Sequence, residues 1–214
     1  KKETLQFMIS NTFNQSAGGA NRNALLLVSA GSNILSCDDD IMFQTYNTKV
    51  KNSNGFIFTS KKNPMEIIFY ENRKDLFNSI HPAKIDIISW HEKFLGKNVN
   101  EIITNCDSIQ FEEINRNFLL SLIMNESKIK ITMPGITGSS GMGSPRSILW
   151  ISDEQKRRVY SNKSIYESCI CSNEVFRVPE EIKISDSSFL MSYNIGLDNH
   201  SILPPFFPIG RASD

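Results

Sequence analysis

Three consecutive aspartates, Asp38, Asp39 and Asp40, directly follow the apolar residues 33–37. Neighbouring carboxylates repel one another and aspartate is a poor strand former, so such a run indicates a bound cation or a solvated turn. Mg²⁺ and Mn²⁺ prefer oxygen ligands, and Mg²⁺ is typically held by one or two carboxylates together with phosphate oxygens of a substrate. A metal held in this way neutralises a diphosphate leaving group. The run is therefore a candidate Mg²⁺ or Mn²⁺ site.

The segments before the aspartates predict a βαβ unit. Residues 4–10 alternate loosely and predict a strand, and residues 20–31 predict a helix with Gly31 as its C-cap. Residues 33–37 predict a short buried strand. This order implies parallel strands joined by a right-handed crossover. In open α/β sheets ligands bind beyond the carboxyl ends of the strands, which is where the aspartates lie.

The stretch GANRNALLLVSAGSNILSCDDD resembles a segment of the family 2-like glycosyltransferases of the GT-A fold. In that family an ARN or NRN helix start, a small-residue helix end and an apolar strand lead into Asp-x-Asp. The matching residues are Arg22, Asn23, Ala30, Gly31, Asp38, Asp39 and Asp40. The resemblance implies that Asp38 and Asp40 bind Mn²⁺ or Mg²⁺, with Asp40 the direct ligand. It also implies that Arg22 and Asn23 contact the nucleotide-sugar donor, as do Asp38 and Asp39.

A second stretch, FFPIGRASD at residues 206–214, resembles the Glu/Asp-Asp motif that carries the catalytic base in those enzymes. The resemblance implies that Asp214 deprotonates the acceptor hydroxyl for in-line attack at the anomeric carbon, with inversion. Ser213 stands where glutamate or aspartate is usual. The family's fold begins with about two further βα units, so we expect a chain that is incomplete at both ends.

Three further side chains are candidates for the acceptor side of such a site. Trp90 and His91 lie in SWHEKFLG, which lacks the second histidine of a zinc-protease helix because Leu95 occupies that position. The two residues would line an acceptor pocket, or else belong to a partly exposed helix face. His200, beside Asp198, would contact the acceptor or form loop hydrogen bonds.

The rest of the chain predicts a mixture of strands and helices. Strands are expected at residues 54–60, 65–71, 128–135 and 188–199, and helices at residues 85–103, with a break at Gly96, and 111–127. The segment GITGSSGMGSP at residues 135–145 predicts a flexible loop. It lacks the Gly-Lys-Ser/Thr ending of a P-loop and the setting of a Rossmann fingerprint, which excludes those nucleotide sites.

The composition limits the function classes. The 214 residues include 23 Lys and Arg against 23 Asp and Glu, which gives no indication of a nucleic-acid partner. No apolar run approaches the length of a transmembrane helix, and residues 1–10 do not form a secretory signal. The four cysteines do not follow zinc-site spacing and are expected to be reduced thiols. A cytoplasmic location, in solution or peripheral to a membrane, is expected.

These observations predict an α/β fold with a GT-A-like (Rossmann-like), mostly parallel sheet flanked by helices. A single domain over residues 1–214 would contain a large mixed α+β insertion at residues 44–147, on the acceptor side. The expected function is metal-dependent transfer of a sugar to a glycan, lipid or peptide acceptor. The alternatives are a non-catalytic interaction module, with Asp38–Asp40 as a calcium loop or plain surface, and a nucleotidyltransferase. The oligomeric state is left open.

Overall fold

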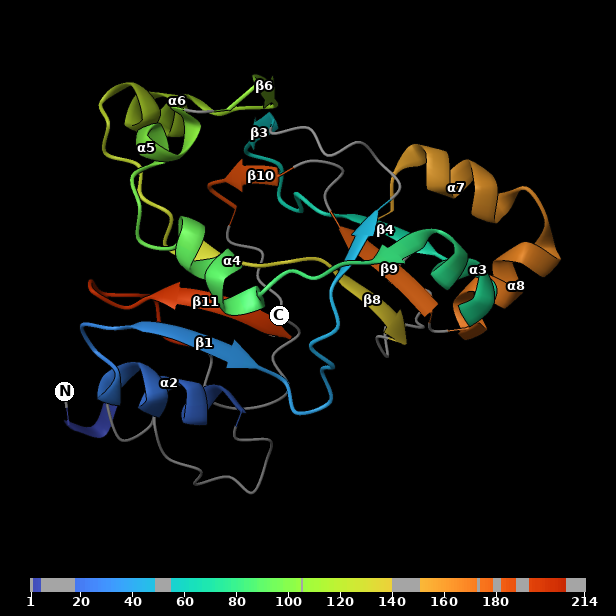
Figure 1. Ribbon diagram of the computed structural model, residues 1–214, viewed down its shortest axis with the longest axis horizontal. Helices are drawn as coiled ribbons and strands as arrows, with labels where there is room; N and C mark the ends of the chain where they lie inside the picture. Colours follow the sequence, from blue (N-terminus) through green and yellow to red (C-terminus); the bar gives the residue numbers. More distant parts are fainter. Residues whose placement is uncertain are drawn as a thin grey trace.

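The computed structural model describes residues 2–4, 18–48, 55–104, 106–139, 151–172, 174–178, 182–187 and 193–206. The elements, labelled in Figure 1, are α2 (Gly18–Val28), β1 (Asn33–Cys37), β2 (Tyr46–Thr48), β3 (Gly55–Thr59), β4 (Glu66–Phe69), α3 (Arg73–Asn78), β5 (Ile80–Pro82), α4 (Ile87–Phe94), α5 (Val99–Ile103), β6 (Ser108–Glu112), α6 (Arg116–Ile123), β7 (Ile131–Thr132), β8 (Ile136–Ser139), α7 (Asp153–Tyr160), α8 (Lys163–Ser172), β9 (Glu174–Val178), β10 (Ile182–Ser185) and β11 (Asn194–Asp198). The protein is a mixed α/β chain.

The described strands form four small sheets. Their orders are β1-β11-β7, β10-β3-β6, β2-β5 and β4-β9-β8. Only the β10-β3-β6 sheet is parallel, and the strand pairs of the other three sheets are antiparallel. The predicted mostly parallel sheet is therefore wrong for these strands. The range 44–147 remains a predicted insertion, although its strands β3, β4, β7 and β8 all pair with strands that follow it.

The structure describes only part of the predicted βαβ unit. The helix and the second strand are present, but no residue of β1 is buried, contrary to the prediction, and β1 pairs antiparallel with β11, with Asn33 opposite Asp198 and Cys37 opposite Asn194. An antiparallel pair needs no crossover helix between its two strands. Here residues 38–193 separate β1 from β11 in the sequence. Lys2 to Thr4 are helical, whereas residues 5–10 of the predicted first strand lie outside the described residues.

Helix α2 runs beside β1, below it in Figure 1. Ala20 and Asn23 are its buried side chains among those described, whereas Val28 is 82% exposed. The chain turns at Gly31, whose φ of 84° lies in the left-handed region that favours glycine. Its backbone N–H donates to the Asn199 carbonyl at 2.9 Å, which joins the end of α2 to the segment after β11.

Helices α4 and α5 form the predicted helix with a break at glycine. Asp86 caps α4 by accepting from the Ile88 N–H at 3.0 Å. Gly96 has a φ of 75°, and its N–H donates to the Ile129 carbonyl at 2.8 Å. The Ile129 N–H in turn donates to the Lys97 carbonyl at 3.0 Å. The break therefore places residue 97 beside the segment that leads into β7.

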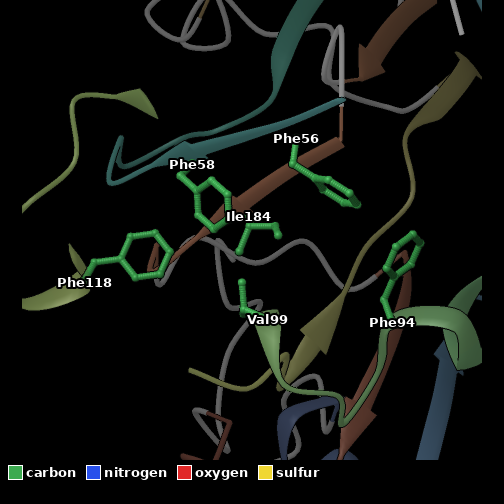
Figure 2. Close-up of a cluster of buried hydrophobic side chains, with 6 residues drawn as sticks. All are labelled: Phe56, Phe58, Phe94, Val99, Phe118 and Ile184. Atoms are coloured by element: carbon green, nitrogen blue, oxygen red, sulfur yellow. The ribbon is translucent and has the colours of Figure 1, made fainter. Parts of the chain in front are cut away.

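An aromatic core covers one face of the parallel sheet. Figure 2 shows side chains from β3, β10 and three helical segments that point toward one another: Phe56, Phe58, Phe94, Val99, Phe118 and Ile184. Phe58 is 1% exposed, and its ring centroid lies 5.5 Å from that of Phe111 and 6.2 Å from that of Phe118. Burial of these rings supplies hydrophobic stabilisation in this half of the protein.

Two further sequence predictions differ from the structure. The helix predicted from residue 111 begins at Arg116, because Asn115 caps it and Phe111 belongs to β6, paired in parallel with β3. Part of the predicted loop at residues 135–145 is strand β8, and residues 140–145 lie outside the described residues.

In the described ranges, no helix has the length and apolar character needed to cross a membrane.

Candidate functional site

The aspartate run leaves β1 at its carboxyl end, as predicted, and meets the start of α2. The Arg22 guanidinium lies 3.1 Å from Asp38 Oδ1, and these side chains are 24% and 40% exposed. Asp39 and Asp40 form a turn and are exposed. No side-chain partner within the described part of the chain faces either of them. The site therefore offers one carboxylate bound to arginine and two that face solvent.

The donor set fits a hard cation only in part. Carboxylate oxygens suit Mg²⁺ and Mn²⁺, and Mg²⁺ sites commonly use one or two of them. However, the described residues contain no group of three or more His, Cys, Asp or Glu side chains arranged to hold a metal ion. A cation at Asp39 or Asp40 would therefore need further oxygens from a bound ligand, such as a diphosphate, or from water.

The beginning of the second predicted motif reaches the same place. Asn23 Nδ2 donates to the Phe206 carbonyl at 2.9 Å, and the Phe206 N–H donates to Asn23 Oδ1 at 2.7 Å. The Arg22 guanidinium carbon lies 5.7 Å from the centroid of the Phe206 ring, within cation–π range. Asp214, the predicted base, lies outside the described residues, so its distance from this site is not defined.

The contact between Asn23 and Phe206 gives a first testable prediction. Asn23 is 4% exposed, and its replacement by alanine leaves the partly buried backbone N–H and carbonyl of Phe206 without this partner. We expect Asn23→Ala to lower the free energy of unfolding by about 1 kcal/mol, measured by urea denaturation. Asn78→Ala on the exposed side of α3 is the matched control. Equal stabilities of the two variants would contradict the proposed importance of the contact.

A hollow of about 470 Å³ extends from Asn23 along α2. We call it the α2 hollow; its apolar lining among the described residues is Leu26, Leu27, Ala30, Ile202, Leu203 and Pro205. Asn199 fixes one wall of it, because its Nδ2 donates to the Leu26 carbonyl at 2.7 Å. His200 and Ser201 also line it. The hollow suits an apolar group next to the predicted donor site.

His91 and Trp90 do not line this hollow. His91 is 3% exposed, and its Nδ1 lies 2.7 Å from Thr132 Oγ1. Burial lowers the pKa of His91, and the neighbouring Asn194 side chain only partly opposes this, so the ring is neutral at pH 7. Trp90 packs edge-to-face on His91 and on Phe94, with ring centroids 5.2 and 5.4 Å apart. Both predicted acceptor residues therefore belong to the packing of α4.

His200 occupies an exposed position in a charged cluster. Its Nδ1 lies 2.7 Å from Asp198 Oδ1, and Lys130 Nζ lies 2.6 Å from Asp198 Oδ2. Lys130 also donates to Ser201 Oγ at 2.7 Å. Burial by itself raises the pKa of Asp198, but the hydrogen bonds from Lys130 and His200 outweigh it and lower the pKa to about 2. Asp198 is therefore ionised throughout the physiological range.

Lys130 and the role of Asp198 were not predicted from the sequence. One signal was available, because Lys128 and Lys130 alternate with isoleucine in KIKI, and alternate residues of an extended chain share a face. The position of Asp198 at the end of an apolar strand was a second signal in the sequence. Neither signal shows that the two segments meet, since Lys130 and Asp198 are 68 residues apart.

Comparisons of this chain with protein-family models, with curated protein sequences and with solved structures found no match. The family of this mixed α/β chain is therefore not shown by them. Two observations bear on the function of the chain. One is the arrangement of Arg22, Asn23, Asp38 to Asp40 and Phe206, and the other is the sequence resemblance.

Proposed function

We propose that this protein is a metal-dependent, GT-A-like glycosyltransferase. It would move a sugar from a nucleotide-diphosphate donor to an acceptor hydroxyl, with inversion. One observation carries the proposal: the two segments that resemble the family separately, residues 19–40 and 206–214, come into direct contact at Asn23 and Phe206. These two residues are 183 positions apart, so their proximity does not follow from sequence spacing.

The charges around the contact support binding of a donor with a diphosphate group. Arg22 presents a guanidinium from the second turn of α2, and the first turn of this helix contains no acidic residue. Backbone N–H groups at a helix start and an arginine fork both suit phosphate oxygens. Asp39 and Asp40 provide exposed carboxylates in the turn after β1. Bound Mn²⁺ or Mg²⁺ would neutralise charge on the leaving diphosphate.

Asp214 is the proposed base for the acceptor hydroxyl, and it follows Phe206 by only eight positions in the sequence. The acceptor is a glycan, a lipid or a peptide, and the apolar α2 hollow, which begins at Asn23, is the proposed place for its apolar part. A cytoplasmic location is part of the same proposal.

The test is calorimetric titration of Mn²⁺, UDP, GDP and each nucleotide with Mn²⁺. Because Asp39 and Asp40 cannot surround a cation by themselves, we expect weak binding of Mn²⁺ alone and clear binding of one nucleotide when Mn²⁺ is present. Asp40→Ala should weaken the metal-dependent binding about tenfold, since one charged ligand is lost.

Asp107→Ala is the matched control, because Asp107 is also an exposed aspartate in a loop next to a strand. It should leave nucleotide binding unchanged. Circular dichroism of both variants verifies that they are folded. If neither nucleotide binds the folded wild-type protein in the presence of Mn²⁺, the glycosyltransferase proposal is wrong and the aspartates form an ordinary surface turn.

A further inference from the structure

A second hollow lies at the opposite end of β1 from Asp38. Its volume is about 480 Å³, and its polar lining includes Asn33, Lys97, Lys128, Lys130, His200 and Ser201. We call it the lysine pocket. Asn33 is the first residue of β1 and Asp38 follows the last, so the lysine pocket is a different site from the one proposed for the sugar donor.

The backbone fixes the three lysines of this pocket on neighbouring segments. Gly96 turns the chain at the end of α4, and Asn98 forms a β-bridge with Lys128. The Asp198 N–H donates to the Lys130 carbonyl at 2.9 Å, which attaches the same segment to β11. The positions of the lysines therefore follow from hydrogen-bonded backbone, although the side chains of Lys97 and Lys128 extend into solvent.

The charge of the pocket is positive. Asp198 is the acidic residue in its described lining, against three lysines. Asp198 is already bound to Lys130 and His200, and its side chain is only 4% exposed. Lys97 and Lys128 have no acidic partner among the described residues. The pocket is thus lined by two exposed lysines that have no acidic partner among the described residues.

Asp198 also orients other polar side chains of the pocket. Lys130 is held between Asp198 and Ser201 Oγ, at 2.6 and 2.7 Å. Because Asp198 engages His200 Nδ1, the other ring nitrogen of His200 remains for a ligand. His200 is the more exposed partner, with 58% of its side chain accessible. Lysine ammonium and serine hydroxyl groups donate to oxyanions, and the bonds from lysine are charge-assisted.

We propose that the lysine pocket binds a phosphate group, with Lys97 and Lys128 as its main charged contacts. The phosphate belongs either to the free ion or to an organic phosphate with an apolar body. The second source is suggested by the α2 hollow, since His200 and Ser201 line both cavities and the α2 hollow is mainly apolar. Phosphate binding here does not depend on glycosyl transfer.

The test uses inorganic phosphate and hexyl phosphate as probes at constant ionic strength. Calorimetry gives the affinities, and backbone amide shifts of Gly96, Lys97 and Ser201 report on the pocket. We expect both probes to bind the wild type and the double variant Lys97→Gln/Lys128→Gln to bind them about tenfold more weakly. The affected lysines are exposed and make no ion pair among the described residues, so the variant should keep its fold.

The control is Lys74→Gln/Lys84→Gln, which removes two exposed lysines outside the pocket and should leave both affinities unchanged. Tighter binding of hexyl phosphate than of phosphate, with shifts at Leu27 and Ile202, identifies an organic phosphate as the ligand class. Equal affinities identify the free ion. The proposal is overturned if neither probe binds at millimolar concentration, or if the two double variants weaken binding equally.

Discussion

Replacement of Gly196 by alanine is expected to destabilise the protein by about 3 kcal/mol, the upper end of the usual range for overpacking. Gly196 lies in the middle of β11, where the His91 ring of α4 approaches the backbone. A Cβ atom at this position would lie 2.4 Å from Thr132 Oγ1 and 2.7 Å from His91 Nδ1. Neither group can move easily, because His91 is buried and Thr132 is in β7. Urea denaturation measures the loss.

Three further variants separate this clash from a general effect of losing a glycine. Gly31→Ala introduces strain at a positive φ but meets no atom within 4 Å, so we expect a loss of only about 1 kcal/mol. Thr132→Ala removes the nearest obstructing atom, and the double variant Gly196→Ala/Thr132→Ala should lose less stability than the sum of the single losses. A Gly196→Ala protein as stable as Gly31→Ala would contradict the close approach of His91.

Asp198→Asn is expected to cost about 2 kcal/mol of unfolding free energy at pH 7, and the cost should fall on acidification. The pKa of Asp198 is about 2 in the folded protein and 3.8 without the fold. Ionised Asp198 therefore stabilises the native state above pH 3.8, and this contribution is lost as the pH falls toward 2. Denaturation of both proteins between pH 7 and pH 2 measures the decline.

Asp153→Asn is the matched control, since Asp153 also pairs with a lysine, Lys156, at 3.2 Å, but its side chain is 84% exposed. Exposed pairs contribute little, so we expect a change below about 0.5 kcal/mol at any pH. If the loss in Asp198→Asn stays constant from pH 7 to pH 2, the ion pair with Lys130 does not stabilise the fold.

The sequence predicted those features of the fold that depend on neighbouring residues. Gly96 follows the C-cap of α4 and adopts a positive φ, and residues 33–37 and 55–59 form strands. Gly31 also has a positive φ, but α2 ends at Val28, three residues before this predicted C-cap. Strand partners could not be predicted in the same way. The antiparallel pairing of β1 with β11 and the parallel pairing of β3 with β6 depend on distant residues, and the latter pairing takes Phe111 out of the predicted helix.

The candidate site also combines features that depend on neighbouring residues with features that depend on distant ones. The exposed turn at Asp38–Asp40 follows from the sequence, whereas the burial of His91 depends on Gly196, a residue 105 positions later that leaves room for the ring. The charged cluster at Asp198 requires Lys130 from a separate segment, and single-sequence patterns do not join such segments. Sugar transfer and metal binding remain predictions, supported by the contact between Asn23 and Phe206.

The pairing of β1 with β11 also has a consequence for biosynthesis. Among the described strands, β11 is the neighbour of β1, and it leaves the ribosome more than 150 residues later. Until then β1 lacks the strand with which it pairs in the folded protein, and α2 lacks its hydrogen bonds to the segment after β11. Exposed strand edges are prone to association with other chains. A nascent chain of this protein therefore requires protection of the β1 segment until β11 has been synthesised.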